Sequence, residues 1–198
     1  MSRRIIVNRE VEREVYLHNV LEDVLFGINV RFDKLTSDPS PKGWKYEAVN
    51  GLIIMAMLNE GWFNAIGEKI VPEWNNRHGA EKRLKQICEL LLSDLSIFDR
   101  PLSSVDALRG IRNEFAHSKP FLERRLDEGV VVDEGDQNAF FKELTHPVEQ
   151  IISVESYQQY RADSEAFRKL VLERSGLRPW DIKTRAHESS TFVREADE

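Results

Sequence analysis

Apolar residues recur at spacings of three and four along several long segments of this 198-residue chain, and this periodicity constrains its fold more than any other feature. Such spacing predicts helices with one buried stripe, because about 3.6 residues complete a helical turn. The first helix is predicted from about Asn8 to Leu35. Its stripe comprises Leu17, Leu21, Val24, Ile28, Phe32 and Leu35, and Val11 and Val15 lie in the preceding turns.

Proline and glycine residues delimit four further helices, which are predicted over residues 44–70, 80–95, 103–117 and 154–175. Pro72, Pro101 and Pro120 follow three of these segments, and Gly176 follows the last, where glycine favours termination. Gly61 weakens the second helix and allows a kink or break there. The connections are short and almost no strand is expected. The predicted fold class is therefore all-α, an antiparallel bundle of four or five helices.

The bundle is expected to occupy residues 1–176 as one domain, which suits the length of the chain. Within it, residues 119–146 are expected to form an irregular acidic excursion, with one short strand or half of a hairpin at residues 129–135. Ser103 or Ser104 is expected to cap the fourth helix. Residues 177–198 are polar, and a mobile C-terminal tail is expected there.

The charge and the cysteine content exclude several classes of protein. The formal net charge of −6 excludes the global basicity of a protein that coats nucleic acid, but it leaves room for a local basic cleft. Cys88 is the single cysteine, so an internal disulfide framework is excluded. No apolar run approaches the roughly 20 residues of a membrane-spanning helix, and no signal-peptide pattern opens the chain. A cytoplasmic protein without a membrane partner is expected.

Residues 103–117 form the segment richest in chemistry, because a helical projection divides it into two unlike faces. The apolar face carries Ala107, Leu108, Ile111 and Phe115 and is expected to pack on the core. The opposite face gathers Arg109, Arg112, Asn113 and His117 around the small residues Gly110 and Ala116. Asn113 lies four residues before His117, a spacing at which its amide can orient the imidazole.

Residues 112–117 (Arg-Asn-Glu-Phe-Ala-His) resemble the signature of the HEPN superfamily, in which an arginine is followed by a polar residue and, several residues later, by a histidine. Leu108 and Ile111 before this run, and Lys119 with Pro120 after it, are also similar to bacterial members of that superfamily. The order of the predicted helices extends the resemblance loosely over residues 9–175. The resemblance implies a HEPN-like bundle that forms a homodimer, with the two motifs facing each other across a cleft.

The resemblance also implies a metal-independent endoribonuclease without a cofactor, of the kind that acts as a toxin or phage-defence effector under an antitoxin or regulatory partner. RNA would supply its own 2′-hydroxyl as nucleophile, and the products would carry 2′,3′-cyclic phosphate and 5′-hydroxyl ends. The implied catalytic residues are His117 as general base, Arg112 as phosphate clamp and Asn113 as an orienting residue. Arg109 and Lys119 are expected to bind the RNA.

Two other interpretations of the motif helix stay open: a non-catalytic HEPN-like dimerisation or binding module, and a chance resemblance. In the first, Arg112, Asn113 and His117 form a polar seam or tie helices together. The other histidines, at positions 18, 78, 146 and 187, lack metal-ligand spacing and are expected on the surface or in loops. Cys88 and the tryptophans at positions 44, 62 and 74 are expected to pack in the core or at a dimer contact, with base stacking as the alternative for the tryptophans.

Overall fold

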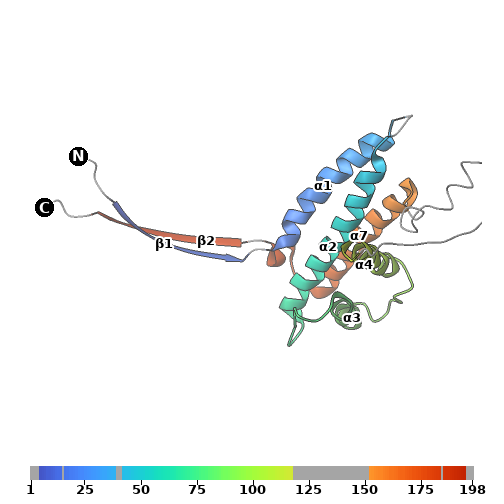
Figure 1. Cartoon of the computed structure of the whole chain (residues 1–198). Helices are drawn as coiled ribbons and strands as arrows, with labels where there is room; N and C mark the ends of the chain where they lie inside the picture. Colours follow the sequence, from blue (N-terminus) through green and yellow to red (C-terminus); the bar gives the residue numbers. More distant parts are fainter. Residues whose placement is uncertain (1–4, 15, 39–41, 118–151, 184, 195–198) are drawn as a thin grey trace, which may run out of the picture.

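The computed structural model describes residues 5–14, 16–38, 42–117, 152–183 and 185–194. In these ranges, five α-helices form a bundle, and two long strands form a ribbon that projects from it (Figure 1). The elements in chain order are β1 (Ile5–Glu14), α1 (Leu17–Thr36), α2 (Trp44–Ile70), α3 (Ala80–Leu91), α4 (Leu102–Ala116), α7 (Val154–Ser175), a short 3₁₀ helix (Pro179–Ile182) and β2 (Arg185–Arg194).

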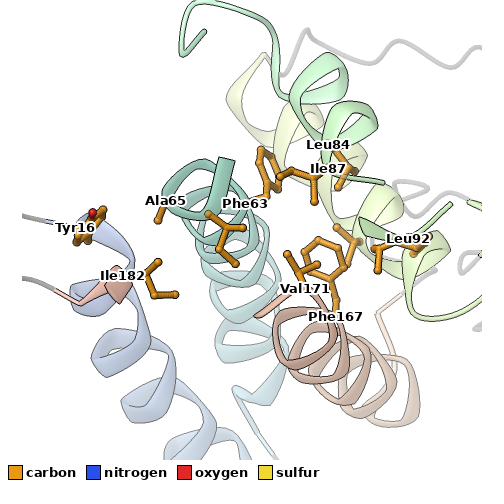
Figure 2. Packing of buried hydrophobic residues seen from close by; sticks show 12 residues of the cluster. Tyr16, Phe63, Ala65, Leu84, Ile87, Leu92, Phe167, Val171 and Ile182 are labelled. Atoms are coloured by element: carbon orange, nitrogen blue, oxygen red, sulfur yellow. The ribbon is translucent and has the colours of Figure 1, made fainter. Parts of the chain in front are cut away.

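The helices pack around α2, which contacts α1, α3, α4 and α7. Its C-terminal half shares one cluster of buried residues with α3, α7 and the 3₁₀ helix, and Figure 2 shows Phe63, Ile87 and Phe167 in that cluster. Its N-terminal half shares a second cluster with α1, α4 and α7, around Phe32 and Met55. Burial of each such side chain contributes about 1.5–3 kcal/mol, so these two clusters hold the bundle together.

The predictions for the second and last helices are confirmed most closely. α2 covers residues 44–70 as one continuous helix, so the break that Gly61 allows does not occur. Ser153 is the N-cap residue of α7, and its hydroxyl accepts a 3.0 Å hydrogen bond from the backbone N–H of Ser156; Gly176 is the C-cap residue, with a φ of 72°. α3 has the predicted start but ends at Leu91, before the predicted Leu95.

The helix predicted from Asn8 is wrong over its first turns, because residues 5–14 form strand β1. β1 pairs with β2 in antiparallel register, from Ile5 opposite Arg194 to Glu14 opposite Arg185. β2 lies in the segment expected to be a mobile tail, and the expectation of almost no strand needs the same correction. The strands come from opposite ends of the chain, so local periodicity gives no sign of their pairing.

A buried carboxylate fixes the N-terminal end of α4. Asp163 on α7 accepts hydrogen bonds from Nε and Nη2 of Arg100, at 2.7 and 2.8 Å, and from the Ser104 hydroxyl at 2.5 Å. Burial raises the pKa of Asp163, but these hydrogen bonds outweigh it and hold that pKa below its ordinary value. The expected serine cap is therefore wrong: Ser104 binds α7, and the N-cap residue of α4 is Pro101.

The buried stripe of α1 is displaced from the predicted one. Leu21, Ile28 and Phe32 are buried as predicted, whereas the side chains of Leu17 and Val24 are exposed. The difference arises because α1 packs mainly against one neighbour, α2, which covers a narrow part of its surface. Residues 119–146, with the strand expected at 129–135, lie outside the described residues. Of the helices described, none has the length and apolar character needed to cross a membrane.

Candidate functional site

α4 carries the motif residues, and its inner side fixes their position. Leu108 and Ile111 are buried in the second core cluster, as the helical projection predicts. Ala107 and Phe115, which the projection also places on this side, are exposed, so the apolar contact ends before the last turn of the helix. The outer side of the helix therefore presents its polar residues at fixed positions on the bundle surface.

Arg112 is the motif residue with the best-defined surroundings. Its Nη1 donates a 2.9 Å hydrogen bond to Oδ1 of Asn113, and its Nη2 lies 3.8 Å from Oε2 of Glu60 on α2. The side chain is 37% exposed. Asn113 is expected to orient His117 or a phosphate, and in the structure its amide oxygen accepts the hydrogen bond from Arg112. The guanidinium is thus held from one side and open to solvent on another.

Arg112 also lines an open cavity of about 470 Å³ that α1, α2, α3 and α4 surround. Glu60 lies in its wall between two guanidinium groups, because the buried Arg83 of α3 donates to Glu60 Oε1 at 2.6 Å. Arg83 also donates to Oδ1 of Asn64 at 2.6 Å. The other polar residues that line this cavity are His18, Glu68 and Asn76. The cavity wall therefore combines two arginines with two carboxylates, and it is not a purely basic cleft.

Arg109, expected to bind substrate, is engaged by acids of its own chain. Its Nε and Nη2 donate to Oδ1 of Asp106 at 3.0 and 2.8 Å, and its Nη1 lies 3.8 Å from Oε2 of Glu81 on α3. Its side chain is 27% exposed. Any anion that binds this guanidinium must compete with both carboxylates.

His117 is the C-cap residue of α4. Its backbone N–H donates a 2.9 Å hydrogen bond to the carbonyl oxygen of Asn113, and the residue is exposed. On a helix, five residues separate two side chains by about 140°, so Arg112 and His117 do not project in parallel. The described residues that line the 470 Å³ cavity do not include His117. Lys119, the other expected RNA contact, lies outside the described residues.

His18 also lines this cavity, which the sequence alone does not predict. It was expected on the surface, but it is buried on α1, with its ring 5.5 Å from that of Tyr16 and 5.6 Å from that of Trp62. Burial lowers the pKa of His18 despite the nearby charge of Glu22. A Cβ at Gly61 would lie 2.9 Å from the His18 Cβ, so glycine permits this close approach. The sequence does contain a signal for the burial of His18, because His18, Leu21 and Leu25 lie on one helical stripe.

The remaining candidates behave as packing residues. Cys88 is half-buried against the first core cluster, and burial raises the pKa of its thiol to about 11. The tryptophans at positions 44, 62 and 74 also pack against the two clusters. Within the described part of the chain, no group of three or more His, Cys, Asp or Glu residues could hold a metal ion. Searches of family models, curated proteins and solved structures return no match for this chain.

Proposed function

We propose that this protein is a metal-independent endoribonuclease of the HEPN type that acts as a homodimer. The observation that carries the proposal is the arrangement at the end of α4: a half-exposed arginine held by a neighbouring amide lies five residues, or about 1.4 turns, before an exposed histidine at the C-cap of the helix. Both residues belong to a helix whose opposite side is fixed in the core. In the dimer, two copies of this helix face each other and form a composite cleft for RNA.

The chemistry assigns a separate role to each residue. His117 accepts the proton of the RNA 2′-hydroxyl, since an imidazole exchanges protons near neutral pH. The resulting oxygen attacks the adjacent phosphorus and expels the 5′-oxygen of the next nucleotide, which takes a proton from solvent as it leaves. Arg112 binds the phosphate with its planar fork of donors and stabilises the charge that develops on it. The products are a 2′,3′-cyclic phosphate and a 5′-hydroxyl.

Asn113 and Arg109 support this reaction without taking part in proton transfer. Asn113 positions the guanidinium of Arg112 through the 2.9 Å hydrogen bond. Arg109 lies one turn earlier on α4 and contacts RNA outside the scissile phosphate, as does Lys119. A cytoplasmic nuclease of this kind requires control, so we assign it to the toxin or phage-defence class with an antitoxin or regulatory partner.

The test is cleavage of a mixture of RNAs by the purified full-length chain in excess EDTA. Arg112→Ala and His117→Ala are each expected to lower the rate about 100-fold or more, the usual range for loss of a general base or phosphate clamp. Arg161→Ala is the matched arginine control, because Arg161 is also half-exposed and paired with a carboxylate, that of Asp33. His78→Ala is the histidine control. Wild-type protein that leaves every RNA intact would refute the proposal.

A second candidate is a non-catalytic dimerisation or binding module. The observation that favours it is the pairing of Arg109 and Arg112 with carboxylates of the same chain, which ties α4 to α2 and α3. If this candidate is correct, the wild-type protein cleaves no RNA. Arg112→Ala then lowers the stability of the fold and leaves the result of the cleavage assay unchanged. Light scattering after size-exclusion chromatography tests the homodimer common to both candidates.

A further inference from the structure

The Glu60 carboxylate is placed as an oxyanion ligand between two arginines of different helices. Its Oε1 accepts from Nη2 of Arg83 at 2.6 Å, and its Oε2 lies 3.8 Å from Nη2 of Arg112. Guanidinium groups bind carboxylate and phosphate oxygens with the same fork of donors. The position of this carboxylate therefore marks a point in the cavity wall where a phosphate oxygen can also be bound.

The contact with Arg112 is the weaker of the two. At 3.8 Å it is an ion pair without a hydrogen bond, and the side chains of Arg112 and Glu60 are 37% and 24% exposed. Within the described residues, one of the five N–H donors of Arg112 makes a hydrogen bond, the one to Asn113. The two arginines and Glu60 together carry a net charge of +1.

Arg83, the second arginine of this cavity, has one donor without a partner in the described part of the chain. It is more than nine-tenths buried, it lines the cavity, and its Nε has no hydrogen-bond partner among the described residues. Buried donors are almost always paired with protein groups or bound water, so this Nε lacks the partner that a buried donor normally has.

We propose that Arg83 and Arg112 form an oxyanion-binding pair for a phosphodiester of RNA, and that Glu60 occupies the place of this phosphate in the free protein. The RNA assignment rests on the proposed function, whereas the pair itself rests on the geometry of the cavity. Glu60 thus acts as an internal competitor that weakens phosphate binding. Arg83 becomes a binding residue that the motif on α4 does not contain.

The experiment measures binding without cleavage. A fluorescein-labelled single-stranded 2′-O-methyl RNA, which lacks the nucleophile, is titrated with the full-length chain in EDTA and followed by fluorescence anisotropy. Glu60→Gln keeps an acceptor for Arg83 but removes the competing charge, and it is expected to tighten binding about tenfold. Glu68→Gln is the matched control, because Glu68 lines the same cavity and accepts from Asn76 instead of an arginine. It is expected to change the affinity less than twofold.

Two results would overturn the proposal: unchanged affinity in Glu60→Gln, or equal tightening in Glu68→Gln, which would indicate a general charge effect. If Glu60→Gln does not fold, Arg112→Gln is compared with Arg161→Gln, and only the former should weaken binding about tenfold; equal weakening refutes the pair. Inorganic phosphate alone is the second arm, followed by thermal shift. Stabilisation by phosphate without RNA binding overturns the assignment to RNA.

These outcomes are separable from those of the proposed function. A chain that binds the 2′-O-methyl RNA as predicted but cleaves no RNA loses the nuclease proposal and keeps the oxyanion pair. A chain that cleaves RNA through Arg112 and His117, with no response to Glu60→Gln, keeps the nuclease proposal and loses the pair.

Discussion

Replacing Asp163 by asparagine is expected to loosen the end of α4 that precedes the motif. The buried carboxylate accepts three hydrogen bonds, two of them from Arg100. A hydrogen bond to a charged group contributes about 1.5–3 kcal/mol, but Arg100 is 56% exposed, so solvent screening reduces its share, and asparagine keeps one acceptor. We expect Asp163→Asn to lower the free energy of unfolding by about 2–4 kcal/mol at pH 7, or Tm by about 5–15 °C.

The loss of unfolding free energy in Asp163→Asn should depend on pH in a defined direction. The pKa of Asp163 in the folded protein lies below its ordinary value, which is about 3.9 in an unfolded chain. A depressed carboxyl pKa contributes stability that is complete above the unfolded pKa and is lost as pH falls through the folded pKa. The difference between wild type and Asp163→Asn should therefore be constant above about pH 5 and shrink below about pH 4.

Urea denaturation followed by circular dichroism, at several pH values, measures this difference. Asp94→Asn is the matched control, because Asp94 pairs with Arg174 at an exposed position and should contribute far less. Equal losses in the two variants, or a loss in Asp163→Asn that persists undiminished at pH 3, would refute the reasoning. RNA cleavage by Asp163→Asn then reports whether the contacts of Asp163 with Arg100 and Ser104 also position the motif residues on α4.

Three further predictions follow from buried groups. Tyr157→Phe removes a 2.7 Å hydrogen bond to Asn29 inside the core and should lower the free energy of unfolding by about 1–3 kcal/mol, measured by urea denaturation. Burial lowers the pKa of His18 in the folded state, so stability should fall as pH drops below about 6.5, and His18→Gln should flatten that dependence in thermal melts. The pKa of Cys88, raised to about 11, predicts that its thiol reacts much more slowly with Ellman's reagent at pH 8 than in urea-unfolded chain.

The helices could be predicted from the sequence because local residues determine them. Tyr157, Ser164, Phe167 and Val171 recur at helical spacing and are buried on one face of α7, and Gly176 follows its end, so local sequence specifies both the face and the end of this helix. The β1–β2 ribbon could not be predicted in this way, since residues 5–14 pair with residues 185–194 at the other end of the chain. The valines at positions 11 and 15 fit a helical period, and only the distant partner strand decides between helix and strand.

The candidate site shows the same division between local and distant information. The split of α4 into an apolar and a polar side follows from spacing along one helix, so Leu108 and Arg112 were placed on the correct sides. Glu60 and Arg83, by contrast, come from other helices and carry no motif. Their approach to Arg112 depends on how three helices pack. A single sequence does not specify that packing at the level of atomic contacts.

The ion pairs around α4 determine what kind of anion can bind there. Each guanidinium of this surface already has a carboxylate partner in the same chain, so an incoming phosphate must displace or share it. A free phosphate that binds here replaces one carboxylate partner and loses its own translational freedom. A polyanion replaces several carboxylate partners but loses its translational freedom only once. Under the proposed function, we therefore expect this surface to bind a long polyanion more tightly than a free phosphate. The same expectation favours an RNA strand as the ligand that we propose for this chain, although the net charge of the chain is negative.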